Sequence, residues 1–182
     1  MLARKAYHMS GAIIPAVYAS TSIPRTVVAG ILGALSLLLL GADAGRRISP
    51  RFDTLFRASF RAILDPKDFI GVNGSTLYFA GCALAAALFS KEIACAAILS
   101  LVLGDPLAAL IGSSVRSPRI GRVSMAGSLA CLGAATAACA LFVEWPRALF
   151  GGLAATLAEA LSGSKFDNLT LPLAVAVALR LL

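Results

Sequence analysis

The chain has 182 residues, of which 59% are hydrophobic and 14% are charged, and its mean hydropathy is +0.87. A soluble domain has about 45–50% apolar and about 25% charged residues, so this composition excludes an ordinary soluble globule and also a disordered chain. The net charge of +7 is typical of basic cytoplasmic loops beside anionic lipid, and we do not take it as a sign of nucleic-acid binding. We therefore predict an all-α, polytopic integral membrane protein with one domain over residues 1–182.

Seven apolar stretches predict transmembrane helices, because about 20 helical residues cross a bilayer core. They lie at residues 6–23, 26–42, 71–90, 92–112, 124–143, 147–161 and 169–182. A basic amphipathic segment at 51–64 predicts a further helix in the plane of the membrane interface. Most Lys and Arg residues fall on one side of this arrangement. The positive-inside rule then predicts a cytoplasmic N-terminus and a C-terminus outside.

The first polar cluster is formed by Arg4, Lys5 and His8. Arg4 and His8 are four residues apart and share one face of a helix. Two interpretations stay open. His8 is a structural side chain beside the interface, or Arg4 and Lys5 contact phosphate while His8 accepts the proton of a lipid hydroxyl.

The stretch Gly-Val-Asn-Gly-Ser-Thr at 71–76 opens the third apolar segment with small and hydroxyl residues. It suits an ordinary helix N-cap, or a cradle in which backbone N–H groups hold phosphate. The side chains concerned are Asn73, Ser75 and Thr76.

The sequence Gly104-Asp105-Pro106 interrupts an apolar run. A carboxylate within a membrane segment costs about 2.5–3.5 kcal/mol on insertion scales, so its presence favours a function for Asp105. The alternative is that Asp105 caps a helix beginning at Pro106. Such a helix start also presents its positive end to phosphate.

Charged residues in the C-terminal half complete the candidate site. Arg116, Arg119 and Arg122 suit a polyphosphate, although the positive-inside bias accounts for them equally well. Glu159 lies in apolar surroundings, so we expect an Arg or Lys partner for it. Asp167 caps the last helix together with Asn168, or it supplies an oxygen ligand to Mg²⁺.

The predicted topology places acidic residues from four separate segments at the cytoplasmic ends of helices. These are Asp43, Asp105, Glu159 and Asp167. Close helix contacts, including a homodimer, are allowed by the small residues Gly30, Gly33, Gly151 and Gly152.

The order of these features resembles the membrane family of dolichol kinases, phytol kinases and CTP-dependent diacylglycerol kinases. It resembles the phosphatidate cytidylyltransferases more distantly. The similarity runs over nearly the whole chain and is most specific at residues 104–112 and 127–130. Further matching pieces are Arg4-Lys5 with His8, Asp43 before a basic stretch, and residues 74–79, 91–94, 159–161 and 167–172. The family's Lys-Ser-x-Glu-Gly-Ser string differs here, since its Lys and Glu fall on Val123 and Ala126.

The resemblance implies transfer of the γ-phosphoryl group of CTP, or of another nucleoside triphosphate, to a membrane lipid alcohol on the cytoplasmic face. The acceptor is a polyprenol, phytol, another isoprenoid alcohol or diacylglycerol. Mg²⁺ would be held by Asp105 and Asp167, and catalysis would use Asp105, His8 and Asp167, with Asp43 and Glu159 as further site residues. Nucleotide and phosphate contacts would come from Arg4, Lys5, Asn73, Ser75, Thr76, Arg116, Arg119, Arg122, Ser128, Lys165 and Asn168.

Two alternatives remain open beside the lipid kinase. One is a CTP-dependent cytidylyltransferase acting on a phospholipid acid. The other is a non-catalytic membrane protein that binds or transports lipid.

Overall fold

The computed structural model describes residues 2–61, 71–162 and 166–182, with side chains from residue 5 onward. The described parts are helical except for loops and one short hairpin. The helices are α1 (Leu2–Ser10), α2 (Ile13–Ser20), α3 (Arg25–Ile48), α4 (Pro50–Phe60), α5 (Gly74–Leu88), α6 (Lys91–Ser114), α7 (Met125–Ala140), α8 (Trp145–Leu161) and α9 (Asp167–Leu181). Strands β1 (Arg119–Ile120) and β2 (Val123–Ser124) form an antiparallel pair.

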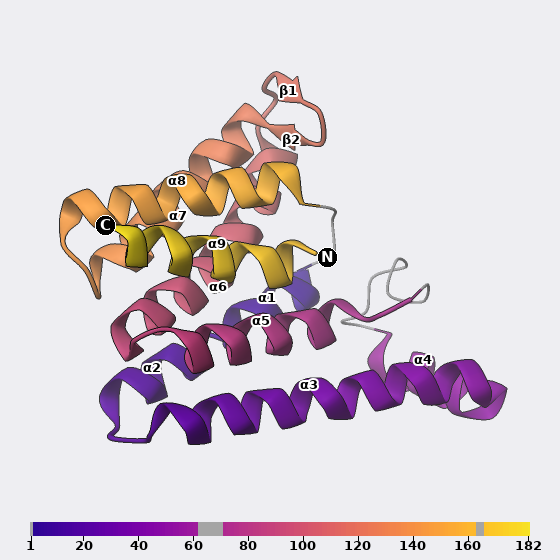
Figure 1. Ribbon diagram of the computed structural model, residues 1–182. Coiled ribbons are helices and arrows are strands. Elements are labelled where there is room, and N and C mark those ends of the chain that lie inside the picture. The colour runs from indigo at the N-terminus through magenta and orange to yellow at the C-terminus, as the bar shows by residue number, and fades with distance from the viewer. Residues whose placement is uncertain (1, 62–70, 163–165) are drawn as a thin grey trace.

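The bundle is organised around α6, which packs against α7, α9 and α2. Its side chains Ile98, Leu101 and Val102 are fully buried and form the centre of the core. In Figure 1, α5, α9 and α8 are stacked above the long helix α3, which runs along one side of the bundle. The same view shows α8 ending and α9 beginning at the end of the bundle where α4 and the hairpin lie.

Local sequence signals set the beginnings of several helices. Ser49 caps α4 by accepting a hydrogen bond from the Phe52 N–H, and Pro50 occupies the first helical turn, where its missing N–H costs nothing. Asn73 caps α5 in the same way through the Ser75 N–H, at 2.9 Å. Ser and Asn are favoured at these positions because their side-chain oxygens satisfy N–H groups that the helix leaves unpaired.

Glycines allow the helices around α6 to approach closely. A Cβ placed on Gly127 of α7 would lie 2.8 Å from the Ala108 carbonyl oxygen of α6. A Cβ on Gly152 of α8 would overlap Thr136 Oγ1 of α7. Any larger residue at these positions forces the helices apart.

The prediction of seven transmembrane helices is wrong. Within the described residues, two helices are both long and apolar enough to cross a membrane, α3 and α6. The apolar helices α5 and α7 have 15 and 16 residues, and at 1.5 Å per residue such helices reach about 23–24 Å, less than the roughly 30 Å of a bilayer core. High hydropathy here partly reflects burial inside the bundle, since more than half of the apolar stretch of α6 is buried.

Two further expectations need correction. The first apolar stretch, residues 6–23, is divided between α1 and α2, because the chain turns at Gly11-Ala12. The second stretch extends beyond residue 42, since α3 continues to Ile48 and carries Asp43 and Arg46 within its last turns. The basic segment predicted at 51–64 is helical over Pro50–Phe60, and its remainder from residue 62 lies outside the described residues.

Candidate functional site

Asp105 lies within α6 and faces two cationic or titratable side chains of α1. Lys5 Nζ is 3.6 Å and His8 Nδ1 is 4.0 Å from Asp105 Oδ2. The three side chains are largely shielded from solvent, with exposed fractions of 15%, 15% and 22% for Lys5, His8 and Asp105. The fold therefore brings the N-terminal cluster to the Gly-Asp-Pro sequence.

The helix-start interpretation of Asp105 is wrong. Helix α6 runs without a break from Lys91 to Ser114, with Pro106 in its interior. Asp105 therefore caps no helix, and no helix N-terminus faces phosphate at this point. A proline inside a helix leaves a carbonyl one turn earlier without its usual N–H partner, so the local polarity of this part of α6 is greater than its sequence suggests.

Glu159, on the last turn of α8, adds a second acidic group beside Asp105. Burial, followed by the negative charges of Asp105 and Asp167, raises the pKa of Glu159 to about 7. Arg122 and Lys5 act in the opposite direction, with smaller effects. We call Asp105, Glu159 and Asp167 the acidic centre. Because Asp105 and Asp167 disfavour ionisation of the Glu159 carboxyl group, added positive charge at this place is stabilising.

Two buried oxygen atoms beside the acidic centre have no hydrogen-bond partner among the described residues, Glu159 Oε2 and Asn168 Oδ1. The Asn168 amide is oriented by its other end, since Nδ2 donates to the Gly74 carbonyl oxygen at 3.2 Å. A buried oxygen without a partner costs free energy. Both are hard oxygen donors of the kind that Mg²⁺ prefers.

The acidic centre does not by itself supply a full set of metal ligands among the described residues. In the part of the chain that the structure describes, no three His, Cys, Asp or Glu side chains are close enough to hold a metal ion. Mg²⁺ in phosphotransferases needs only one or two carboxylates, because substrate phosphates and water complete its coordination. Asp105 and Asp167, the predicted metal ligands, are the carboxylates of the acidic centre that would serve in this arrangement.

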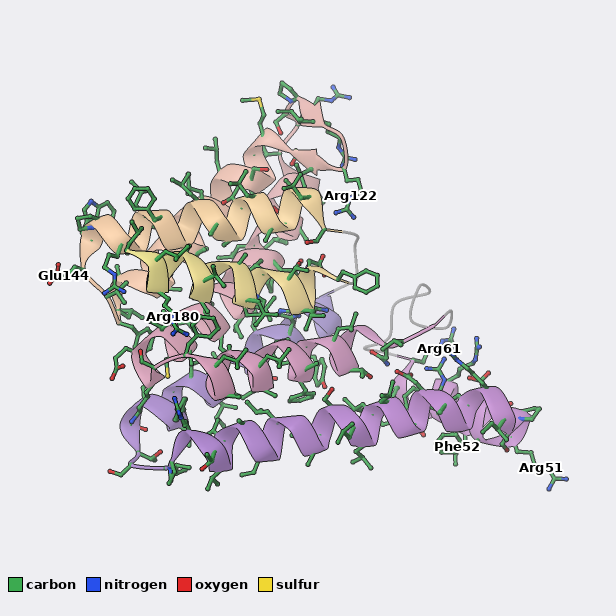
Figure 2. The ribbon with its side chains drawn as sticks, viewed as in Figure 1. Arg51, Phe52, Arg61, Arg122, Glu144 and Arg180 are labelled. Atoms are coloured by element: carbon green, nitrogen blue, oxygen red, sulfur yellow. The ribbon has the colours of Figure 1, made fainter. Side chains whose placement is uncertain are left out.

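Arg122 lies between the two strands of the hairpin, at the end of the bundle where α8 ends (Figure 2), and its guanidinium contacts backbone carbonyls. Nη2 donates to the carbonyl oxygen of Ser162 and, at 3.3 Å, to that of Glu159. These contacts satisfy carbonyl groups that the end of α8 leaves unpaired. Arg122 thus contacts the backbone of Glu159, and within the described residues no Arg or Lys forms the expected ion pair with its carboxylate.

Asp43 belongs to a separate buried cluster, which we call the Asp43 clamp. Its Oδ2 accepts hydrogen bonds from the Asn73 N–H at 2.8 Å and the Thr76 hydroxyl at 3.0 Å, and its Oδ1 pairs with Arg46 at 3.2 Å. Arg46 in turn contacts Asp53 of α4 at 3.0 Å. The clamp therefore joins α3, α4 and the start of α5.

This clamp decides between the two interpretations of residues 71–76. Asn73 caps α5 and is buried, and the Thr76 hydroxyl is bonded to Asp43. These side chains serve the helix start and the clamp. Ser75 supplies its N–H to the Asn73 cap.

The other candidate phosphate contacts lie at different distances from the acidic centre. Arg116 and Arg119 are exposed on the hairpin side, and Ser128 is half-buried on α7. The side chain of Arg4 and the whole of Lys165 lie outside the described residues.

Of the four glycines considered for helix contacts, Gly30 and Gly33 face open space, whereas Gly151 and Gly152 are packed inside the bundle against α7.

Sequence reasoning missed Tyr78 as a neighbour of His8. The two rings are in edge-to-face contact, with 5.3 Å between centroids and 74° between planes. Tyr78 reads as an ordinary apolar helix residue, and only its position on α5 opposite the α1–α2 junction brings it to His8. No spacing in the sequence signals this contact.

Comparison with known proteins gives one relative and no assigned activity. No family model matches the chain, and no solved structure matches it. The chain is 29% identical over 128 residues to the uncharacterized protein RP860 of Rickettsia prowazekii (strain Madrid E). The match covers 69% of this chain and 62% of that protein, so the chain spans less than two thirds of the length of this relative.

Proposed function

We propose that this chain is a membrane-associated phosphotransferase that moves the γ-phosphoryl group of a nucleoside triphosphate, CTP before others, to the hydroxyl of a lipid alcohol. The observation that carries the proposal is the acidic centre beside Lys5 and His8, at one end of the helix bundle. Its carboxylates suit a magnesium ion bound to the nucleotide, and the Lys5 ammonium group suits a phosphate. The His8 imidazole suits the proton that the acceptor hydroxyl loses. The similarity of the motifs to lipid-alcohol kinases supports the same reaction.

The apolar surface of the bundle supports a lipid acceptor. Helices α3 and α6 have the length and composition of membrane spans, and α3 exposes large apolar side chains such as Ile31, Leu37 and Leu38. An acceptor with an apolar tail would lie along such a surface, with its hydroxyl at the polar end of the bundle. The substrate class therefore follows from the apolar surface and the polar site together.

Charge distribution supports a cytoplasmic location of the site. Arg51, Arg61 and Arg122 lie at the end of the bundle that carries the site, whereas Glu144 and Arg180 lie at the opposite end (Figure 2). By the positive-inside rule, the end rich in arginine faces the cytoplasm, where nucleotides are available. In this proposal the N-terminus is cytoplasmic.

The proposed reaction assigns two tasks to Asp105 and one to each of the other residues of the site. The oxygen of the lipid hydroxyl bonds to the γ-phosphorus, and the bond from this phosphorus to the leaving nucleoside diphosphate breaks. His8 accepts the proton that the hydroxyl loses. Asp105 favours the imidazolium that forms, because its carboxylate is 4.0 Å from His8 Nδ1. Lys5 neutralises charge on the transferred group, and Asp105 and Asp167 would hold the magnesium ion of the nucleotide, which would offset phosphate charge when bound. Such catalysis consists mainly of positioning and electrostatics, which a small bundle can supply.

A phosphoryl-transfer assay on detergent-purified protein tests the proposal. CTP or ATP labelled at the γ-phosphate is offered with Mg²⁺ to farnesol, geranylgeraniol, phytol, a long polyprenol and diacylglycerol. The expected product is a labelled lipid monophosphate, reduced by about 10²- to 10³-fold in Asp105→Asn, since one electrostatic group of an active site contributes about that much. Glu144→Gln is the matched control, because this exposed carboxylate lies at the opposite end of the bundle.

The same assay separates the other two functions. With CTP labelled at the α-phosphate and a phospholipid acid as acceptor, a cytidylyltransferase gives a labelled CDP-lipid and pyrophosphate. Absence of every labelled lipid, with all donors and acceptors, contradicts the kinase and favours lipid binding or transport. The positions Val123 and Ala126, where the resembled family has Lys and Glu, are then the first residues to examine.

A further inference from the structure

Tyr78 of α5 lies in the junction between α1 and α2 and touches both sides of it. Its ring packs edge-to-face on His8, with centroids 5.3 Å apart. Its hydroxyl lies against Gly11, where a Cβ atom would overlap it. The side chain is buried, with 8% of its surface exposed. An aromatic side chain fixed in this way has few alternative rotamers.

His8 is therefore bounded on two sides by different helices. Asp105 of α6 lies 4.0 Å from Nδ1 of the imidazole, and Tyr78 of α5 packs against its ring. Helix α1 is short, with nine residues, and a helix of this length has little stability of its own in solution. The orientation of its histidine must therefore come from the groups packed around it.

We propose that Tyr78 is a positioning residue that fixes the orientation of the His8 imidazole relative to Asp105, with Gly11 providing the space for its ring. This inference rests on the proposed function for its catalytic consequence. Tyr78 acts through His8 and has no contact with the reacting atoms. Its hydroxyl has no chemical task, so the aromatic ring is the part of the side chain that matters.

Kinetic comparison of two variants tests the catalytic consequence. Tyr78→Leu removes the ring and is expected to lower kcat about tenfold or more, because small errors in the position of a catalytic group are costly. The KM for the nucleotide is expected to stay within about twofold of the native value, because the substitution does not change contacts made equally in the ground state and the transition state. Tyr78→Phe retains the ring and is expected to keep kcat close to that of the native chain. A loss of kcat in Tyr78→Phe equal to that in Tyr78→Leu would overturn the role of the ring.

Imidazole NMR gives a readout that does not depend on activity. His8 is the single histidine of the chain, so protein labelled with ¹⁵N and ¹³C in histidine gives one imidazole spin system. Its shifts are expected to change in Tyr78→Leu and to stay close to native in Tyr78→Phe. Tyr18→Leu is the matched control, because Tyr18 is also a buried tyrosine, on α2, and packs near Lys91; it should leave the imidazole signal in place.

The two readouts keep the outcomes separate. If the native chain transfers no phosphoryl group, the proposed function fails, and the NMR comparison still tests the positioning of His8. If the imidazole signal is the same in Tyr78→Leu and in the native chain, the positioning role is wrong. Gly11→Ala provides a second variant in case Tyr78→Leu does not fold. Its methyl group displaces the Tyr78 ring, so it is expected to move the imidazole signal in the same spectrum, and an unmoved signal also contradicts the inference.

Discussion

Lys5 of α1 and Asp105 of α6 form an ion pair, with 3.6 Å between Nζ and Oδ2. The pair joins the N-terminal helix to the middle of the helix on which the core is built. Both groups are largely shielded from solvent, so each depends on the other for charge compensation. A polyanionic ligand would engage Lys5 while its magnesium ion engages Asp105, so the pair is suited to be shared with a nucleotide.

Replacing Lys5 by Gln is expected to weaken nucleotide binding more than it slows the chemical step. A hydrogen bond to a charged group contributes about 1.5–3 kcal/mol, which corresponds to a rise in KM for the nucleotide of about 10- to 100-fold. Steady-state kinetics with varied nucleotide and a saturating lipid acceptor measure this change. Arg25→Gln, an exposed cation at the start of α3, is the control. Equal effects of the two variants would show that Lys5 acts only through net charge.

Glu159 makes stability depend on pH in a defined direction. Burial, then Asp105 and Asp167, raises its pKa from 4.5 to about 7, so the fold favours the protonated form. The contribution of Glu159 to the free energy of unfolding is fully present below about pH 4.5, and it is lost as the pH rises through about 7. Glu159→Gln mimics the protonated group and is expected to melt a few degrees higher than the native chain above pH 7, since the partly exposed group is screened by solvent.

Melting curves from pH 4 to pH 9, followed by circular dichroism in detergent, measure this difference. The gap between Glu159→Gln and the native chain should close toward pH 4.5. A gap that is constant over the whole range would mean that Glu159 is stabilised by packing and that its ionisation is unimportant. A native chain that melts higher than the variant at pH 8 would show a net favourable partner for the charged carboxylate.

The positions of the helices followed from the sequence because their ends carry local signals. Ser49 with Pro50, Asn73 and Ser124 each cap the helix that follows them, and such caps act within three residues along the chain. The membrane crossing of these helices did not follow, because hydropathy does not distinguish a lipid-facing residue from one buried against another helix. Ile98 and Leu101 are as apolar as any lipid-facing residue, yet both are fully buried in the bundle.

The candidate site was predicted in its composition but not in its contacts. Asp105, Glu159 and Asp167 stood out because charged residues in apolar surroundings are costly, and that cost is visible in a sequence. Which cation meets which carboxylate depends on packing between distant helices. For this reason the pairing of Asp43 with Asn73 and Thr76, and the contact of Tyr78 with His8, appear only in the structure.

The Asp43 clamp is expected to contribute strongly to stability. Asp43→Ala removes one of the two carboxylates that Arg46 contacts, Asp53 being the other, and it removes the acceptor for the Asn73 N–H and the Thr76 hydroxyl. Breaking a buried pair by removing one partner costs about 3–5 kcal/mol, which lowers the melting temperature by on the order of 10 °C. Thermal unfolding in detergent measures this fall in melting temperature. Glu144→Ala, at an exposed position, is the control. Equal melting temperatures of the two variants would contradict a structural role for the clamp.

Close packing of α7 on α8 gives a matched pair of glycine substitutions. A Cβ at Gly152 would overlap Thr136 Oγ1 and lie 3.0 Å from the Leu132 carbonyl oxygen, whereas nothing lies within 4 Å of a Cβ at Gly33. Overpacking costs about 1–3 kcal/mol, so Gly152→Ala is expected to lower the melting temperature by about 2–12 °C. Gly33→Ala is expected to raise it slightly, because alanine is favoured over glycine in a helix by up to about 1 kcal/mol.

The two glycine variants are compared in the same detergent by thermal unfolding, and each changes the composition by one methyl group. A general effect of replacing glycine would therefore move both melting temperatures in the same direction, and that result would contradict the close contact between α7 and α8. Opposite shifts would show that the contact at Gly152 sets the distance between the two helices. Glu159 lies on the same helix as Gly152, two turns closer to its end, so the Gly152→Ala variant is also expected to lower phosphoryl transfer, while Gly33→Ala leaves it unchanged.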